Sequence, residues 1–323
     1  MLDNVFLDIK DLKKYYPVTS GLFSSHAGDV KAVDGVSFQI KEGEIVGLVG
    51  ESGCGKSTLG RTILRLEQPT AGRIIYRGRD ITNMGGKQLR GLRKELQIIF
   101  QDPEASLDPR MPVGDSIGEG LTIHNIGDEK GRMTRISELM MQVGLKPDQA
   151  VLYPHELSGG QKQRIGIARA LAIDPQLIVA DEPVSALDVS IQAQILNLML
   201  DIQQELGLAY LFIAHDLSVI KYMAHRIAVM YLGKIVELAD NRELFSSPLH
   251  PYTEALLSAV PRLKQKGSER LLLKGDVPSP LNPPKGCHFH PRCHRVMQVC
   301  SEVEPELIEV SPRHQVACHL HTV

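Results

Sequence analysis

The segment Gly50–Thr58 has the residue types and spacing of a phosphate-binding loop. It reads Gly-Glu-Ser-Gly-Cys-Gly-Lys-Ser-Thr and fits the pattern G-x-x-x-x-G-K-[ST] between an apolar run and a helix-like segment. Glycines let successive N–H groups turn toward an anion, and a helix start adds partial positive charge. We expect Lys56 to contact the β- and γ-phosphates of a nucleotide and Ser57 to contact Mg²⁺. The predicted contact residues are Gly50, Ser52, Gly53, Gly55, Lys56, Ser57 and Thr58.

Two adjacent carboxylates, Asp181 and Glu182, follow the apolar run Leu177–Ala180. A buried strand would bring both to the carboxyl edge of a sheet, where ligands of α/β proteins bind. Asp181 is predicted to act on the Mg²⁺ shell, and Glu182 to orient or deprotonate an attacking water. Alone, the pair would equally suit a solvated strand end, but the phosphate loop in the same chain favours catalysis.

A glycine pair lies between these motifs, in the segment Leu157–Arg164 (LSGGQKQR), ahead of the helix-like run Gln161–Ala172. The start of such a helix receives anions. One nucleotide needs only one loop of this kind for its phosphates, so this segment suggests a second nucleotide contact.

The segment resembles the LSGGQ signature of the ATP-binding-cassette (ABC) ATPases, and the resemblance covers residues 5–245. The other motifs of the family follow in its order: Gln101 at the Q-loop, Ser185–Asp188 at the D-loop, His215 at the switch position, and Tyr16, or alternatively Tyr15, as the aromatic residue that stacks on adenine. Gln101 and His215 would be ordinary residues in isolation and gain these roles only from their positions relative to the other motifs.

The resemblance implies a mechanism with two cassettes packed head to tail around two ATP molecules. Ser158, Gly159, Gly160 and Gln161 would then contact the ATP of the partner, and Asp188 would cross the interface. His215 would contact the γ-phosphate. Gln101 would join Ser57 and Asp181 around Mg²⁺, so that Glu182, His215 and Gln101 form the catalytic set.

Four of the five cysteines, Cys287, Cys293, Cys300 and Cys318, lie in the last part of the chain with the spacing C-x5-C-x6-C-x17-C. Reduced cysteines grouped in this way favour a metal or cluster site. Zinc sites usually contain close C-x2–4-C pairs, whereas iron–sulfur clusters accept more varied spacings. We expect a [4Fe–4S] cluster that staples the region, with zinc and free thiols as alternatives; Cys54 is expected to be only a small loop side chain. The histidines that could replace a ligand are His288, His290, His294, His314, His319 and His321.

This region also supports a narrower resemblance. His250–Thr253 (HPYT), the stretch VPSPLNPPKGC and the four cysteines resemble the C-terminal extension of oligopeptide and dipeptide importer ATPases, in particular their F-type subunits. That resemblance favours the [4Fe–4S] cluster and implies an ATPase docked on two membrane permeases through residues 102–112. A homologous second ATPase and an external substrate-binding protein would complete the importer. Nickel and glutathione importers share much of this cassette, and the sequence does not separate their substrates.

The surrounding elements predict an α/β fold that can position these motifs. Apolar runs at Glu44–Gly50, Leu96–Phe100, Leu177–Ala180 and Tyr210–Ala214 suit buried parallel strands. Helices are expected over Lys56–Leu66, Val113–His124, Arg132–Val143, Ser190–Leu206 and Thr253–Val260, and Ser190–Leu206 should bury the stripe Ile191, Ile195, Leu198, Ile202 and Leu206. Hairpin-like segments at Val30–Ile40, Arg73–Ile81 and Arg226–Leu238 suggest antiparallel strands.

The predicted architecture is therefore a P-loop NTPase of the ABC type. It has an antiparallel β subdomain, a helical insertion and a small irregular cysteine-rich extension. We expect the nucleotide-binding domain over residues 1–250, with its helical subdomain at about 102–165, and the extension over residues 251–323.

Composition limits the competing functions. The formal net charge is −2 and 43% of the residues are apolar, as in ordinary globular proteins. No long block of one charge marks a nucleic-acid-binding protein, and no apolar run reaches the ~18–20 residues that span a bilayer. The charged N-terminus lacks the apolar core of a signal peptide, so we expect the protein to fold in the cytosol. The resemblance to importer ATPases implies a peripheral position on the cytoplasmic face of the inner membrane. There are two alternatives of a different class: a soluble ABC ATPase that acts on DNA or ribosomes, and a metal-sensing module.

Overall fold

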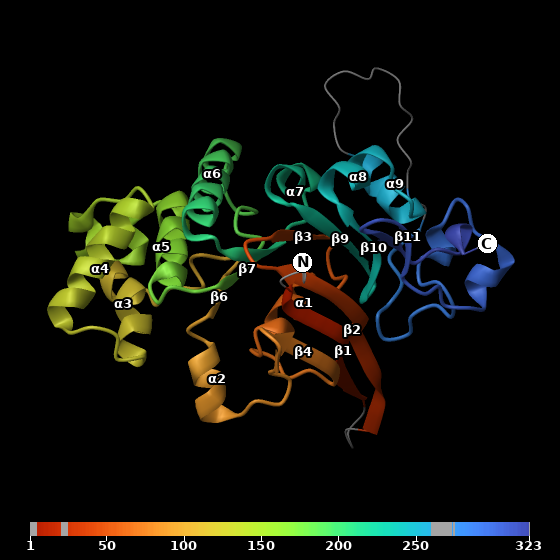
Figure 1. Ribbon diagram of the computed structural model, residues 1–323, viewed down its shortest axis with the longest axis horizontal. Helices are drawn as coiled ribbons and strands as arrows, with labels where there is room; N and C mark the ends of the chain where they lie inside the picture. The colour runs from red at the N-terminus through yellow and green to blue at the C-terminus, as the bar shows by residue number, and fades with distance from the viewer. Residues whose placement is uncertain (1–4, 21–24, 260–272, 274, 323) are drawn as a thin grey trace. The chain divides into compact units, whose positions relative to one another are not determined.

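The computed structural model describes residues 5–20, 25–259, 273 and 275–322. The chain divides into two compact units. Unit 1 comprises Met1–Ile40, Ile45–Asn83 and Ala214–Val323, and unit 2 comprises Lys41–Glu44 and Met84–Ile213. Figure 1 labels most of the helices and strands and colours the chain by residue number.

Unit 1 contains a four-stranded sheet in the order β2-β1-β4-β5. Its strands are β1 (Val5–Ser20), β2 (Ser25–Lys41), β4 (Ala71–Tyr76) and β5 (Arg79–Asp80). Strand β4 is antiparallel to both β1 and β5, which confirms the predicted hairpin at Arg73–Ile81. The hairpin predicted at Val30–Ile40 is wrong, because β2 is one strand. There Asp34 N donates to Gly233 O (2.8 Å), and the Asp34 carboxylate pairs with Lys234 (3.3 Å), so this part of β2 is fixed to Gly233 and Lys234.

A second set of strands in unit 1 has the order β11-β12-β10-β9-β3. Strand β3 (Ile45–Val49) is parallel to β9 (Arg226–Tyr231), and β9 forms the predicted hairpin with β10 (Lys234–Asp240). The helices of this unit are α1 (Lys56–Ile63), α7 (Leu217–Met223), α8 (Asn241–Ser246) and α9 (Pro251–Ser258). Helix α1 ends earlier than predicted because Arg65 takes a left-handed conformation with φ +54°.

The C-terminal region is more regular than the sequence suggests. Strand β12 (His314–Val316) pairs antiparallel with β10 and with β11 (Ile308–Ser311), and neither short strand was predicted. Three 3₁₀ turns, η3 (His290–Arg292), η4 (Gln298–Ser301) and η5 (His319–His321), connect the rest. We expected a bound cluster to be the reason why this region is ordered. Backbone pairing and the buried side chain of Phe289 also contribute to its order. The domain boundary near residue 250 stays a prediction.

Unit 2 has the predicted parallel strands β8 (Ala209–Ile213), β7 (Leu177–Asp181) and β6 (Leu96–Ile99), with β7 in the middle. Every residue of β7 and β8 is buried, as expected for strands covered on both faces. The helices are α2 (Gly86–Leu92), α3 (Val113–Ile123), α4 (Glu129–Gln142), α5 (Gly159–Leu171) and α6 (Val189–Leu206), with 3₁₀ turns η1 (Pro147–Val151) and η2 (Pro154–Glu156). The predicted helical insertion is thus present between β6 and β7 (Figure 1).

Helix α6 buries Ile195 and Ile202 of the predicted stripe, but the rest of its buried face differs from the prediction. Its buried residues are Ile195, Leu196, Met199, Ile202 and Gln203. Leu206, expected on the buried face, is 47% exposed. Gln203 lies in the core because its amide donates to Gly43 O (2.7 Å) and Leu208 O (3.2 Å). A pattern of apolar residues alone cannot identify a polar residue whose hydrogen bonds allow its burial.

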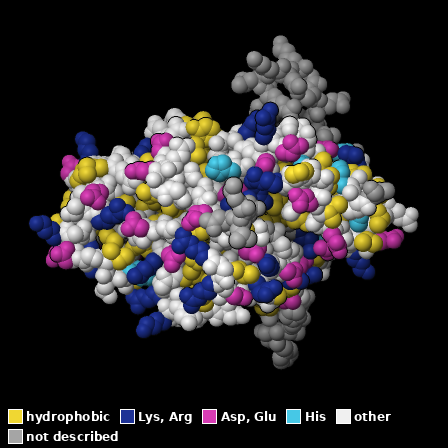
Figure 2. All heavy atoms as spheres, in the orientation of Figure 1, with side chains coloured by type: hydrophobic (Ala, Val, Ile, Leu, Met, Phe, Trp, Pro, Cys, Tyr) yellow, Lys and Arg dark blue, Asp and Glu magenta, His cyan; other side chains and the backbone are white. Residues whose placement is uncertain are grey.

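None of the helices in the described ranges combines the length and apolar character needed to cross a bilayer. On the face drawn in Figure 2, Lys and Arg side chains are interspersed with Asp and Glu side chains.

Candidate nucleotide-binding and catalytic site

The phosphate loop of unit 1 connects β3 to α1, and two of its glycines have no room for a side chain. Gly50 has φ +158° and Gly55 has φ +108°. A Cβ at Gly50 would lie 2.1 Å from Met230 O, and a Cβ at Gly55 would lie 1.9 Å from Ala32 O. The loop is therefore packed directly against neighbouring backbone, and only glycine allows this curvature.

Lys56 lies at the start of α1 with its ammonium inside the loop. Its Nζ donates to Gly50 O (2.8 Å) and Glu51 O (3.0 Å), and the residue is only 5% exposed. These bonds fix a positive charge among the backbone N–H groups at the helix start. Ser57 and Thr58 follow in the first turn and are partly exposed, whereas Ser52 and Gly53 are exposed at the loop tip.

His215 lies beside the strand that leads into this loop. Ala214 N donates to Leu48 O (3.2 Å), so Ala214, the residue before His215, lies beside β3. His215 is exposed, and the next residue, Asp216, caps α7 through Ser218 N (2.7 Å). The structure thus brings the predicted switch histidine to the same edge of unit 1 as the phosphate loop.

The two candidate adenine-stacking tyrosines are both partly exposed on β1. The Tyr15 hydroxyl donates to Asp34, and the Tyr16 hydroxyl donates to Glu67. Burial and the bond to Asp34 raise the pKa of Tyr15. Neither ring has a described contact that selects it for adenine, so the choice of Tyr16 stays a prediction.

In unit 2, Asp181 and Glu182 differ sharply in environment. Asp181 closes β7 and is 1% exposed, whereas Glu182 is partly exposed and has φ +46°. The N–H of Glu182 donates to Ile213 O (3.0 Å), and the Glu182 carboxylate accepts a hydrogen bond from Gln101 Nε2 (2.9 Å). A left-handed conformation in a residue other than glycine costs energy and occurs most often at functional sites. The structure therefore joins two of the three predicted catalytic residues.

The predicted D-loop follows directly. Asp188 is exposed at the start of α6, and Gln192 Nε2 donates to Val184 O and Leu187 O (2.9 Å each), which holds the turn in place. Asp188 makes no side-chain cap to its own helix.

The signature segment forms a capped helix start. Ser158 N donates to Gln161 Oε1 (2.9 Å), and Ser158 Oγ accepts from Gln161 N (3.4 Å), which is a capping box. Ser158 and Gly159 are exposed, and Gly160 and Gln161 are partly exposed. A Cβ at Gly160 would lie 2.7 Å from Ile191 Cγ2. The start of α5 therefore presents backbone N–H groups at the surface.

None of the four C-terminal cysteines forms a disulfide bond. Burial, together with the smaller effect of the charges of Cys300, Cys318 and Cys293, raises the pKa of Cys287 to about 11. Burial also raises the pKa of Cys293 and of Cys318. Within the part of the chain that the structure describes, no three His, Cys, Asp or Glu side chains are arranged to hold a metal ion. The structure therefore does not support the predicted metal site.

The nearby histidines contact protein groups. His288, His290, His319 and His321 bond backbone carbonyl oxygens, His294 lies 3.5 Å from the Glu254 carboxylate, and His314 bonds Glu237. Cys54 is buried in the phosphate loop, and burial raises its pKa, in keeping with a packing role.

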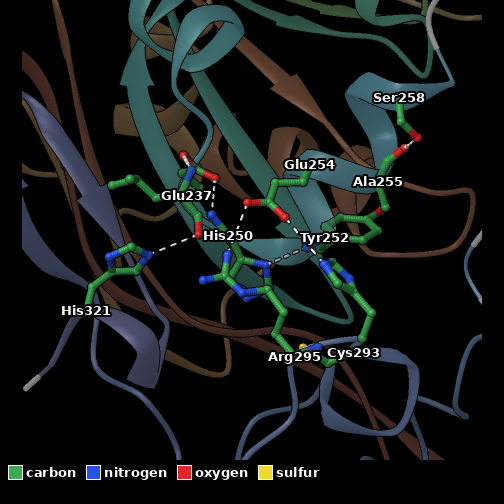
Figure 3. Close-up of polar contacts among 11 residues, drawn as sticks. Glu237, His250, Tyr252, Glu254, Ala255, Ser258, Cys293, Arg295 and His321 are labelled. Atoms are coloured by element: carbon green, nitrogen blue, oxygen red, sulfur yellow. Dashed lines mark hydrogen bonds and ion pairs between the residues drawn. The ribbon is translucent and has the colours of Figure 1, made fainter. Parts of the chain in front are cut away.

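Sequence reasoning missed a buried carboxylate that fastens the C-terminal region. Glu237 is fully buried on β10 and accepts hydrogen bonds from Leu249 N (2.8 Å), His250 N (2.9 Å) and His314 Nε2 (2.7 Å). Figure 3 shows its carboxylate directed at the start of α9. A glutamate within the apolar strand KIVELAD was the available signal, because buried charges require partners.

Comparisons with known proteins agree with these motifs. Residues 33–185 match the family model described as "ABC transporter", and residues 236–300 match "Oligopeptide/dipeptide transporter, C-terminal region". The chain is 56% identical over 320 residues to the oligopeptide transport ATP-binding protein AppF of Bacillus subtilis, covering 98% of this chain and 97% of that protein. It is 50% identical to a putative peptide import ATP-binding protein of Brucella ovis, with 98% of both chains covered. Both predicted resemblances are confirmed.

Solved structures extend the comparison to the fold. The dimeric post-hydrolysis structure of the ATP-binding cassette MJ0796, bound to ADP and Pi, has a TM-score of 0.65 and 29% identity, and covers 73% of this chain and 99% of that one. The cbiO1 protein of Clostridium perfringens, part of the transporter complex cbiONQ, has a TM-score of 0.64 and 26% identity, with 76% and 92% covered. The predicted α/β cassette fold is confirmed.

Proposed function

This chain belongs to the ATP-binding proteins of the ABC transporter family, and we propose that it binds and hydrolyses ATP to power the import of dipeptides and oligopeptides. One observation carries the proposal. A phosphate loop that admits only glycine at two positions and encloses a lysine occurs in a chain that also matches the oligopeptide/dipeptide C-terminal region.

In the proposed reaction, each of the residues described above has its own role. Lys56 and the loop N–H groups hold the β- and γ-phosphates, and Tyr16 stacks on adenine. Glu182 orients or deprotonates the attacking water, and its bond to Gln101 fixes the carboxylate. His215 contacts the γ-phosphate. The products are ADP and phosphate.

Mg²⁺ would be held by Ser57, Asp181 and Gln101. Hydroxyl, carboxylate and amide oxygens are the hard ligands that this ion prefers, so the donor set fits. The buried position of Asp181 gives a carboxylate for which a cation is a favourable neighbour. When bound, the ion neutralises charge that develops on the phosphate oxygens.

The exposed signature supports a head-to-tail dimer. Ser158, Gly159, Gly160 and Gln161 would contact an ATP held by a homologous second ATPase, and Asp188 would reach across the interface. Their exposure leaves them available to a partner. The dimeric form of the MJ0796 cassette lends this arrangement support.

The remaining partners follow from the proposed import role. Two membrane permeases would bind the surface near residues 102–112, and an external binding protein would select the substrate. The chain would thus act at the cytoplasmic face of the inner membrane as a peripheral subunit. The names of the relatives, oligopeptide transport and peptide import proteins, favour peptides over nickel or glutathione.

The [4Fe–4S] cluster remains a separate proposal. A single ion needs all its ligands around one point at about 2.3 Å from sulfur, whereas a four-iron cluster spreads its thiolates over separate iron atoms. Burial raises the pKa of Cys287, Cys293 and Cys318. Buried thiols are costly to ionise unless positive charge lies nearby, and bound iron would supply that charge.

Uptake measurements test the import proposal. Cells that lack the chain and cells that carry it are compared for uptake of a labelled dipeptide, a labelled pentapeptide, glutathione and nickel. The proposal predicts that uptake of one or both peptides depends on the chain and is lost in a Lys56→Ala variant. If only the uptake of nickel or glutathione depended on the chain, the peptide assignment would be replaced, and the assignment as an ATPase would stand.

Anaerobic purification tests the cluster. We expect a brown protein whose iron–sulfur absorbance is lost in Cys293→Ser. A colourless protein with stoichiometric zinc would favour the zinc alternative, and one with neither metal would favour free thiols.

A further inference from the structure

The C-terminal cysteine region reaches the phosphate loop directly through Glu51, the residue that follows Gly50. Arg292 Nη1 donates to Glu51 Oε2 (2.6 Å), and Arg292 Nη2 donates to Glu51 Oε1 (3.0 Å), so the pair is bidentate. The backbone of the same residue is held as well, because Glu51 N donates to the Tyr252 hydroxyl (2.8 Å). Both partners belong to unit 1 and come from separate elements, η3 and α9.

Burial makes this contact strong and specific. The Arg292 side chain is 7% exposed and that of Glu51 is 26% exposed. Its bonds to Glu51 outweigh burial and raise the pKa of the Arg292 guanidinium, which therefore stays charged. Two parallel N–H···O bonds between planar groups fix both distance and orientation. Removing one member would leave the other charge poorly compensated.

The guanidinium is positioned by an aromatic cluster. Tyr231, Tyr252 and Phe289 pack with ring centroids 4.8–5.4 Å apart, and the Arg292 guanidinium lies 5.9 Å from the Tyr231 ring. Phe289 lies in the same short segment as Arg292, and Arg292 N donates to Phe289 O (3.0 Å). The arginine therefore cannot shift without disturbing the packing of β9 and α9.

The same segment carries two of the thiols. Arg292 immediately precedes Cys293, and Cys287 N donates to Cys300 O (2.8 Å), which ties the segment to the third cysteine. Figure 3 shows Cys293 and Arg295 below Glu254 of α9. A change in the arrangement of the thiols would therefore move the backbone that carries Arg292.

On the other side, Glu51 contacts the lysine that is proposed to bind ATP. Lys56 Nζ donates to Glu51 O (3.0 Å) and to Gly50 O (2.8 Å). A continuous series of contacts thus runs from the thiol segment through Arg292 and Glu51 to Lys56.

We propose that Arg292 is a positioning residue that couples the segment 287–300, which carries Cys287, Cys293 and Cys300, to the phosphate loop. Nucleotide binding and the order of this segment would then depend on each other. This inference rests on the proposed function of the loop as an ATP site. Coupling between two sites is reciprocal: whatever rearranges the thiols changes nucleotide affinity by the same factor with which nucleotide stabilises the segment.

The test uses hydrogen–deuterium exchange of the full chain, with and without Mg²⁺ and a non-hydrolysable ATP analogue. In the wild type, the analogue should slow exchange of amides in 287–300 by about fivefold or more. Arg292→Gln should abolish that protection and weaken analogue binding by about fivefold or more. The matched control is Arg295→Gln, because Arg295 is nearby but 46% exposed and bonds Glu254 instead of the loop; it should retain the protection.

Two further variants guard against misfolding. Arg292→Lys keeps the charge but loses the fork, so it should give intermediate coupling. Cys293→Ser as a single substitution should change the affinity for the analogue. Combined with Arg292→Gln, it should cause no further change in that affinity. Full protection and unchanged affinity in Arg292→Gln would overturn the proposal. A wild type that fails to bind the analogue in calorimetry would instead refute the ATP site on which it rests.

Discussion

The side-chain amide of Gln101 donates a 2.9 Å hydrogen bond to the carboxylate of Glu182, although the two residues lie 81 positions apart in the chain. Glu182 holds a left-handed backbone conformation at this point, with φ +46°. The carboxylate is thus fixed in position by a neutral amide donor. Such a carboxylate is suited to accept a proton from water.

Replacing Glu182 by Gln should stop turnover and preserve nucleotide binding. The amide keeps the size of the side chain but cannot accept a proton, so the rate of phosphate release should fall by about 10²-fold or more. Binding of MgATP, measured by calorimetry, should change little, and dimers should accumulate in size-exclusion chromatography with ATP. Undiminished phosphate release would remove Glu182 from the proposed role.

A methyl group at Gly55 should destroy the phosphate loop. The added Cβ would meet Ala32 O at 1.9 Å, and the backbone there has φ +108°. Gly53→Ala is the matched control, because that Cβ meets nothing within 4 Å although φ is +77°; it carries only the backbone strain of about 1–2 kcal/mol. Calorimetry should show no MgATP binding for Gly55→Ala and weakened binding for Gly53→Ala. Equal binding by both variants would contradict the steric argument.

Removing the Glu237 carboxylate should loosen the C-terminal region. Glu237→Ala leaves three donors without their acceptor, the buried ones of His250 and His314 and the partly buried one of Leu249. Such losses cost about 3–5 kcal/mol, measurable as the free energy of unfolding in urea. The exposed Glu302 provides a control, since Glu302→Ala should change it by about 0.5 kcal/mol or less. A stable Glu237→Ala variant would show that the carboxylate is dispensable.

Acid should destabilise the fold through His250. Burial lowers the pKa of this imidazole to about 4, with Glu237 opposing and His321 assisting the shift. In the unfolded chain it titrates near 6.5, so the unfolded chain binds more protons between these values. The free energy of unfolding should therefore fall as pH drops from about 6.5 to 4, by on the order of 3 kcal/mol from this group.

His250→Asn isolates that contribution. Asparagine keeps an oxygen that can accept from Tyr252 N, as His250 Nδ1 does now (3.0 Å), but it does not titrate. The pH dependence of unfolding should be shallower in this variant and unchanged in a variant of the exposed His155. If the free energy of unfolding depended on pH equally in the wild type and in His250→Asn, His250 would not be the cause of the acid destabilisation.

The sequence predicted the cassette because its motifs are local. The phosphate loop, the capping box at Ser158 and the strand before Asp181 each depend on residues within a few positions of one another. Short apolar strands bounded by turns were found for the same reason. Local patterns of this kind survive without knowledge of tertiary contacts.

What could not be predicted depends on distant partners. Arg292 and Glu51 are 241 positions apart, and no local pattern relates them. Strand β12 is only three residues long and exists because β10 offers an edge to pair with. Asp34-Gly35 is a common turn pair, yet it lies within the single strand β2, where Asp34 contacts Gly233 and Lys234. In each case tertiary contacts override the local preference.

The central claim, that this chain is an ATPase, is tested most directly by phosphate release from the purified chain assembled with its permeases. The wild type should release phosphate from MgATP continuously, and Lys56→Ala, which removes the enclosed ammonium, should show no release above background. Failure of the assembled wild type to bind or cleave MgATP, or an unchanged rate in Lys56→Ala, would contradict the account.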